Sequence, residues 1–141
     1  MTVIDATDSI LGRMSTVVAK RLLLGESIDI INAEKAVVTG RKHEVTKEYL
    51  ERSKIGSKNW GPFWPKSPER IVKRTIRGML PYKKGRGREA FKRLKTHIGV
   101  PETLAKEKAE TIEEAGLHKA SAHSFVKIAD ISKAMGAKWN E

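Results

Sequence analysis

Hydrophobic residues near the start of the chain alternate between the spacing of strands and the spacing of helices. Residues 2–6 are a short apolar run that predicts a buried strand, followed by a turn at residues 8–9. The next apolar residues share one face of a helix, with spacings of three and four: Leu11, Met14, Val18 and Leu22. They predict a helix from an N-cap at Ser9 to residue 24. Residues 27–32 predict a second strand, and residues 36–38 form a third short apolar run.

The middle of the chain predicts further helices and one irregular segment. Residues 42–54 predict a helix with a thin apolar face, and the glycines and prolines of residues 55–67 indicate irregular structure. Ser67 as a cap and Pro68 at the first helical position predict a helix that ends before Pro81. A basic loop at residues 83–88, a short helix around residues 89–92 and a strand near residues 94–100 are expected to follow.

The last third of the chain is less apolar. Residues 102–116 predict an exposed helix, residues 125–128 a last strand, and Asp130 a cap for a helix ending near Gly136. The alternation of strands and helices along the whole chain predicts an α/β fold whose parallel sheet is covered on both faces. We expect a single domain over residues 1–141, with a basic part at 41–100 and a peripheral C-terminal part at 102–141.

Composition narrows the class of protein. The 141 residues are enough for one core, and the absence of cysteine excludes disulfides, thiolate metal sites and a cysteine nucleophile. No basic segment followed by an apolar one opens the chain, so no signal peptide is expected, and the apolar runs are too short to cross a bilayer. These features predict a soluble cytoplasmic protein without a membrane partner.

Positive charge is concentrated in the middle of the chain. The formal net charge is +11, yet residues 41–100 alone hold 18 basic and five acidic residues, a balance of +13. Like charges repel, so such a concentration favours a partner with closely spaced negative charge. Nucleic acid fits best, with anionic lipid and an acidic protein as weaker alternatives.

One predicted helix separates its charged residues from its apolar ones. On a helical projection one arc holds Ile71, Val72, Thr75, Ile76 and Met79. The opposite arc holds four cations and no acid: Arg70, Lys73, Arg74 and Arg77. Ordinary solvated helix faces mix both signs, so this face is expected to contact phosphates rather than only water.

Two other basic segments could add phosphate contacts. The loop at residues 83–88 supplies further donors, and Gly85 and Gly87 would let its backbone approach a sugar-phosphate chain. Arg41 and Lys42 follow Thr39-Gly40 at the start of a helix, where a phosphate contact and an ordinary turn are both compatible with the pattern.

Three aromatic residues lie in the irregular segment: Trp60, Phe63 and Trp64. Aromatic rings stack on unpaired bases in many RNA sites. The same rings could instead attach an irregular loop to the core. The sequence leaves both interpretations open.

Catalytic and metal-binding patterns are absent. The four histidines, His43, His97, His118 and His123, are scattered, and no metal or cofactor is expected. Asp5 and Asp8 fit a turn better than a catalytic pair, and neither a Walker loop nor a dinucleotide fingerprint occurs. We therefore expect no enzyme activity. The alternative is a small α/β enzyme or binding domain for a phosphorylated ligand, with a pocket near Asp5 or Thr39.

Short blocks of the chain resemble, in the same order, those of the L-thirteen family of large-subunit ribosomal proteins: residues 3–7 (VIDAT), 11–13 (LGR), 19–22 (AKRL), 31–35 (INAEK), 37–40 (VVTG), 68–71 (PERI), 78–81 (GMLP), 87–88 (GR), 90–91 (AF) and 94–95 (LK). The glycine-punctuated basic segment and the Gly-Val-Pro at residues 99–101 are similar to the archaeal and eukaryotic branch. Residues 102–141 match more loosely.

The resemblance implies a three-layer α/β/α domain with a mainly parallel four-stranded sheet and a basic helix-loop extension. It also implies a structural constituent of the large ribosomal subunit that binds ribosomal RNA and neighbouring ribosomal proteins and helps assembly. We accordingly expect RNA contacts from Arg70, Lys73, Arg74, Arg77, Lys83, Lys84, Arg86, Arg88, Lys92, Arg93, Arg41, Lys42, Trp60 and Trp64.

Overall fold

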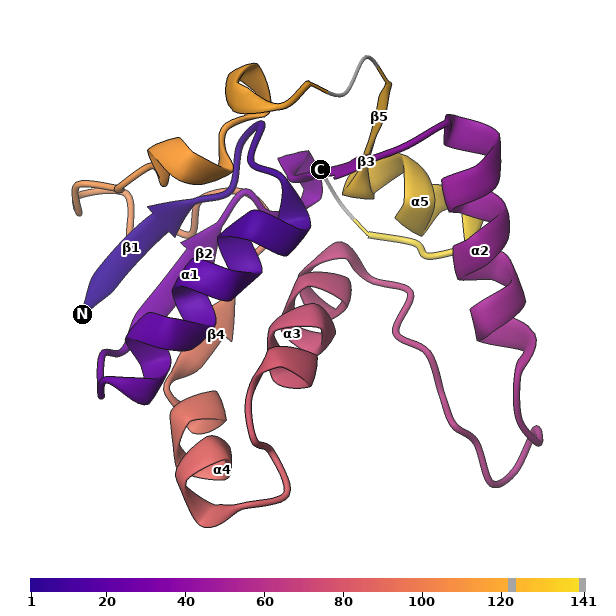
Figure 1. Cartoon of the computed structure of the whole chain (residues 1–141), viewed down its shortest axis with the longest axis horizontal. Helices are drawn as coiled ribbons and strands as arrows, with labels where there is room; N and C mark the ends of the chain where they lie inside the picture. Colours follow the sequence, from indigo (N-terminus) through magenta and orange to yellow (C-terminus); the bar gives the residue numbers. More distant parts are fainter. Residues whose placement is uncertain (122–123, 140–141) are drawn as a thin grey trace.

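The computed structural model describes residues 1–121 and 124–139 and has a mixed α/β fold (Figure 1). The strands are β1 (Thr2–Asp5), β2 (Ile28–Ile31), β3 (Val37–Thr39), β4 (Leu94–Thr96) and β5 (Phe125–Lys127). The α-helices are α1 (Leu11–Leu23), α2 (Lys42–Lys54), α3 (Pro68–Met79), α4 (Gly85–Lys92) and α5 (Ile128–Ala134). Short 3-10 helices are η1 (Ala33–Lys35), η2 (Glu113–Ala115) and η3 (Leu117–Lys119). No helix of the described ranges is both long and apolar enough to cross a membrane.

The strands form two separate sheets. β1, β2 and β4 make a parallel sheet in the order β1-β2-β4, whereas β3 pairs antiparallel with β5. A parallel neighbour of β2 needs a crossover of about a dozen residues, and the chain from Ile31 to Val37 is too short to provide one. The third apolar run therefore leaves the parallel sheet. Within the described residues this sheet has three strands, where four were expected.

The two faces of the parallel sheet are covered differently. Ile4 and Ile30 belong to the main core, together with residues of α1 and α3. Val3 and Ile31 point to the other face, where Leu104 packs against them. The prediction of a helix at residues 102–116 is wrong: this segment consists of turns, two isolated bridges and η2. Backbone hydrogen bonds to β1 and the burial of Leu104 outweigh the helix propensity of its many Glu, Lys and Ala residues.

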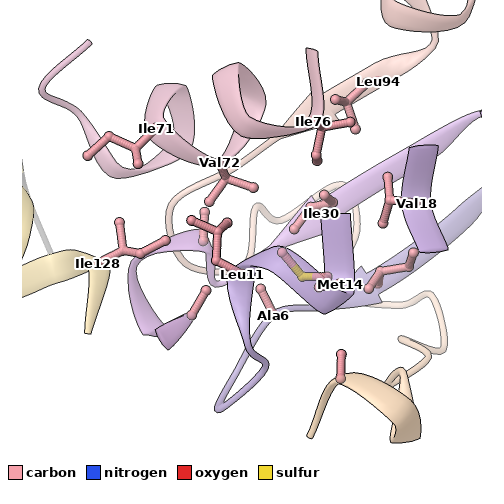
Figure 2. Packing of buried hydrophobic residues seen from close by; sticks show 14 of the residues in the cluster. Ala6, Leu11, Met14, Val18, Ile30, Ile71, Val72, Ile76, Leu94 and Ile128 are labelled. Atoms are coloured by element: carbon pink, nitrogen blue, oxygen red, sulfur yellow. The ribbon is translucent and has the colours of Figure 1, made fainter. Parts of the chain in front are cut away.

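The main core lies between α1, α3 and the parallel sheet (Figure 2). Met14 and Val18 of α1 face Val72 and Ile76 of α3, and all four side chains are fully buried. Ile128, from the C-terminal part of the chain, belongs to the same cluster. Both ends of the sequence therefore contribute to one core, and this core fixes α3 with its opposite face outward.

Of the three residues predicted to cap helices, the structure places only one at the N-cap position. Ser67 occupies the N-cap of α3 with Pro68 at the first helical position, although its hydroxyl makes no capping hydrogen bond. Ser9 was wrongly predicted as the cap of α1: Ile10 is the cap, because Ser9 is buried and its carbonyl accepts a bond from the Val37 amide. Asp130 lies in the first turn of α5 rather than at its cap.

Candidate nucleic-acid interface

The basic face of α3 points away from the core because its apolar face is buried in the core. Ile71 and Val72 are almost completely buried, while Arg70 keeps 75% of its side chain exposed. Lys73, Arg74 and Arg77 are half-buried. The predicted separation of charged and apolar arcs is confirmed for Ile71, Val72 and Ile76, whereas Met79 at the end of the helix is 41% exposed. All four cations also line one small hollow together with Phe91, so the helix presents them as a single patch.

Three of these cations lie over aromatic rings of neighbouring segments. The guanidinium carbon of Arg74 is 3.9 Å from the centre of the Trp64 ring, and that of Arg77 is 5.2 Å from Tyr82. Lys73 Nζ lies 5.3 Å from the centre of the Phe91 ring. Cation–π contacts fix the position of a charge without neutralising it. The side chains are therefore held in place for an external anion.

Carboxylates compensate little of this charge. Arg70 lies 3.8 Å from Glu69, whereas Lys73, Arg74 and Arg77 have no carboxylate partner among the described residues. Burial lowers the pKa of the Arg74 guanidinium, and the nearby charge of Arg77 lowers it further. Both causes disfavour the charged form of Arg74. A phosphate that binds here would therefore be attracted more strongly, because Arg74 has already lost part of its solvation.

The segment after α3 is more regular than its sequence indicates. A helix, α4, begins at Gly85, so the expected loop at residues 83–88 is limited to a turn. Gly87 is buried, and a Cβ there would lie 2.1 Å from the Pro81 carbonyl oxygen. Its role as a point of approach for a sugar-phosphate chain was wrongly predicted, because Gly87 lets α4 pack against the turn that follows α3. Gly85 is exposed and has free space around it.

The cations around α4 fall into two groups. Arg93 donates to the Leu22 carbonyl at 2.8 Å, and Arg86 to the Leu23 carbonyl at 3.2 Å. These bonds satisfy carbonyls at the end of α1, where a positive charge is also favourable. The side chains of the remaining cations are exposed and make no hydrogen bond or ion pair within the described part of the chain: Lys83, Lys84, Arg88 and Lys92.

Arg41 and Lys42 lie at the start of α2, beside β3 and α5 and away from α4 (Figure 1). Arg41 is 3.6 Å from Glu44, and Lys42 is 3.3 Å from Asp130. The structure therefore does not bring this pair into the patch on α3. A phosphate contact at this position stays a separate prediction.

The two tryptophans of the irregular segment have different environments. Trp60 is 90% exposed in the irregular segment between α2 and α3. Trp64 is half-buried and packs against the main core. Of the two interpretations that the sequence left open, packing applies to Trp64, and Trp60 has its ring free.

The alternative ligand site near Asp5 is occupied by internal hydrogen bonds. The Asp5 Oδ1 accepts bonds from the Thr7 amide at 2.9 Å, the Thr7 hydroxyl at 2.7 Å and Asn32 Nδ2 at 3.0 Å. Burial raises the pKa of Asp5, but these bonds and the charge of Lys35 together bring it below its ordinary value. Asp5 is thus an ionised group that closes a turn. No group of three potential metal ligands exists in the described residues, and His123 lies outside them.

Comparison with known proteins decides the family. The sequence model described as ribosomal protein L13 matches residues 1–103. The chain belongs to the ribosomal protein L13 family. It is 52% identical over 136 residues to large ribosomal subunit protein uL13 of Archaeoglobus fulgidus, covering 96% of this chain and 87% of the relative. It is 49% identical over 140 residues to uL13 of Methanosarcina barkeri, covering 99% of this chain and 100% of the relative. It is 44% identical over 135 residues to uL13 of Haloarcula marismortui, covering 96% of this chain and 90% of the relative.

This L13-family chain also has site residues that the sequence analysis missed. Tyr49 and Arg52, near the end of α2, lie beside Trp64 and Arg74 and line a cavity with them. Their spacing of three places them on one helix face, which was the available signal. Arg52 also forms an ion pair with Glu48 on the same helix. The link to Trp64 is visible only in three dimensions.

Proposed function

We propose that the chain is a structural constituent of the large ribosomal subunit that binds large-subunit rRNA and has no catalytic role. The observation that carries this proposal is the patch on α3, where Lys73, Arg74 and Arg77 are braced by aromatic rings and have no carboxylate partner in the described residues. Membership of the L13 family and the names of the relatives support the same assignment. It places the protein on the cytoplasmic ribosome, beside rRNA and neighbouring large-subunit proteins.

The mechanism is neutralisation of several phosphates by a surface formed before binding. Lys and Arg release counterions from RNA when they bind phosphates. The exposed cations of α4 and the preceding turn extend the patch on α3: Lys83, Lys84, Arg88 and Lys92. Because the rings already hold three cations of α3, little side-chain freedom is lost on binding. The RNA-facing part that we propose for this domain, residues 41–100, is therefore centred on α3 and α4, while Arg86 and Arg93 also fix α4 to α1.

The salt dependence of binding tests this mechanism. With about six to eight phosphates contacted, log affinity for large-subunit rRNA should fall against log salt with a slope of roughly −4 to −7. Replacing Arg74 and Arg77 together by alanine should weaken binding and make the slope shallower. Fractionation supplies the second measurement: the protein should co-sediment with the large subunit and leave it only in high salt or denaturant. A flat salt response would contradict the proposal.

The sheet has a candidate for the fourth strand that the family resemblance implies. The Glu110 amide donates to the Val3 carbonyl at 2.8 Å, and the Asp5 amide donates to the Glu110 carbonyl at 3.0 Å. These two bonds form a parallel bridge at the outer edge of β1. We infer that the chain around Glu110 takes the place of the fourth parallel strand.

A further inference from the structure

A small cavity lies where α2, the irregular segment and α3 meet. It has a volume of about 280 Å³. Tyr49 and Arg52 line it from α2, Trp64 from the irregular segment, and Arg74 and Gly78 from α3. Two aromatic rings and two guanidinium groups therefore surround one hollow, which also adjoins the basic patch through Arg74.

The two arginines are held beside the same ring. The guanidinium carbons of Arg74 and Arg52 lie 3.9 Å and 5.6 Å from the centre of Trp64, and Arg52 is also 5.9 Å from Tyr49. Arg52 pairs with Glu48, which does not line the cavity. Arg74 donates to the Phe63 carbonyl at 3.2 Å. Each guanidinium has five N–H groups, so both retain donors for a ligand.

Gly78 keeps one wall of the cavity open. Glycine is a poor helix former, yet it occupies the last turn of α3. A Cβ at this position would meet no atom within 4 Å, and its backbone is not in the left-handed region. Neither packing nor backbone conformation within the described chain therefore requires glycine here. Because Gly78 also lines the cavity, the missing side chain leaves the helix backbone open to a ligand on this wall.

We propose that this cavity binds one unpaired nucleotide of large-subunit rRNA, with its base against Tyr49 and the Arg74–Trp64 stack and its phosphate on Arg52 and Arg74. This inference rests on the proposed function and adds a specific subsite to it. Aromatic rings and guanidinium planes stack on the faces of bases, and guanidinium groups bind phosphate oxygens in pairs. The volume is just below the range of about 300–1,000 Å³ typical of small-ligand pockets, which suits a single base.

RNA is favoured over a free nucleotide because the cavity continues into the patch on α3. Arg74 lines both the cavity and the hollow that holds Arg70, Lys73 and Arg77. A nucleotide bound here would therefore have its neighbouring phosphates beside these cations, of which Lys73 and Arg77 have no carboxylate partner in the described residues. Stacking tolerates every base, so the cavity selects an unpaired nucleotide rather than a particular sequence.

The test fills the cavity without changing any charge. In Gly78→Leu the new side chain occupies the open wall, and leucine favours the helix. Gly12→Leu is the matched control, because Gly12 is also an exposed helical glycine with free space around it but does not line the cavity. Full-length wild-type and variant proteins are titrated with archaeal large-subunit rRNA transcribed in vitro. Thermal unfolding should show that both variants are folded.

We expect Gly78→Leu to bind the RNA roughly tenfold more weakly, with the salt slope retained because no cation is removed. Gly12→Leu should bind like the wild type. Ultraviolet crosslinking and peptide mapping should place an RNA adduct on Tyr49 or Trp64 in the wild type, and this adduct should be lost in Gly78→Leu.

Other outcomes overturn the inference in distinguishable ways. Wild-type affinity in Gly78→Leu, together with no adduct on Tyr49 or Trp64 in the wild type, would show that no base enters the cavity, while salt-dependent binding would leave the proposed function standing. Saturable binding of a free mononucleotide that Gly78→Leu abolishes, without any change in RNA affinity, would assign the cavity to a small ligand instead. Failure of all three proteins to bind RNA in a salt-dependent manner would reject the proposed function itself.

Discussion

Arg21 of α1 holds Glu110 with two hydrogen bonds, Nη1 to Oε2 at 2.8 Å and Nη2 to Oε1 at 2.9 Å. The pair joins a helix on one side of the sheet to the chain segment that extends the edge of β1. The hydrogen bond from Arg21 lowers the pKa of Glu110 below its ordinary value; burial opposes this shift, and the positive charge of Arg21 adds to it. The ion pair therefore links the stability of this edge to pH.

Replacing Glu110 by glutamine should lower the free energy of unfolding at neutral pH by less than about 1 kcal/mol, because both side chains are partly exposed and screened by solvent. A carboxyl group whose pKa falls on folding contributes stability above its unfolded pKa of about 4.3, and loses it as pH falls through the folded pKa. Urea unfolding of wild type and variant should therefore converge in acid. Glu107→Gln, at an exposed position without an ion pair in the described chain, is the control and should show no such pH dependence.

Gly87→Ala should destabilise the protein by about 1–3 kcal/mol, because the added Cβ would collide with the Pro81 carbonyl oxygen and displace α4. Gly85→Ala should be neutral or slightly stabilising, since a Cβ there meets nothing within 4 Å. Thermal unfolding of the two variants measures the difference. Equal melting temperatures would show that α4 can shift at no cost.

Alanine substitutions of the adjacent cations Arg93 and Lys92 should affect different properties, stability in the first case and RNA binding in the second. Arg93→Ala removes the bond to the Leu22 carbonyl and should lower stability by about 1.5–3 kcal/mol. Lys92→Ala should leave stability unchanged, weaken binding to large-subunit rRNA and reduce the magnitude of the salt slope by about 0.7–0.9. Urea unfolding and RNA titration on the same preparations separate the effects. A stable Arg93→Ala would contradict the structural role of that bond.

Replacing the two tryptophans should also separate stability from RNA binding. Trp64→Ala removes a half-buried ring and the Arg74 stack, and should destabilise the fold by about 2 kcal/mol. Trp60→Ala should leave the melting temperature unchanged, because the ring is exposed. If Trp60 stacks on RNA, one of the two interpretations that the sequence leaves open, its loss should weaken binding by about 1–3 kcal/mol. Unaltered RNA affinity would remove Trp60 from the interface.

The regular elements could be predicted because their patterns are local. The bounds of α2, the start of α3 at Pro68 and the buried strands follow from periodicity and from helix-start residues. Residues 102–116 could not be predicted, because their conformation depends on the edge of β1 and on burial of Leu104 against Val3. Both are contacts with the opposite end of the sequence.

The candidate interface also combines features that a local sequence pattern predicts with features that it cannot predict. The arc of cations on α3 is readable from a helical projection. The difference between Lys92 and Arg93 is not, because both are cations at the end of one helix and only the position of α1 distinguishes them. The cavity beside Trp64 combines side chains from three segments that are separated in sequence, so no local pattern could indicate it.

The antiparallel pairing of β3 with β5 has a consequence for synthesis of the chain. Translation delivers Val38 early and its partner Val126 near the end. During that interval β3 cannot form this ladder, and an unpaired strand is a template for association with other chains. The basic segment, residues 41–100, is complete before β5 emerges. An RNA that engages the nascent chain at this stage would therefore meet a fold that still lacks its last strand.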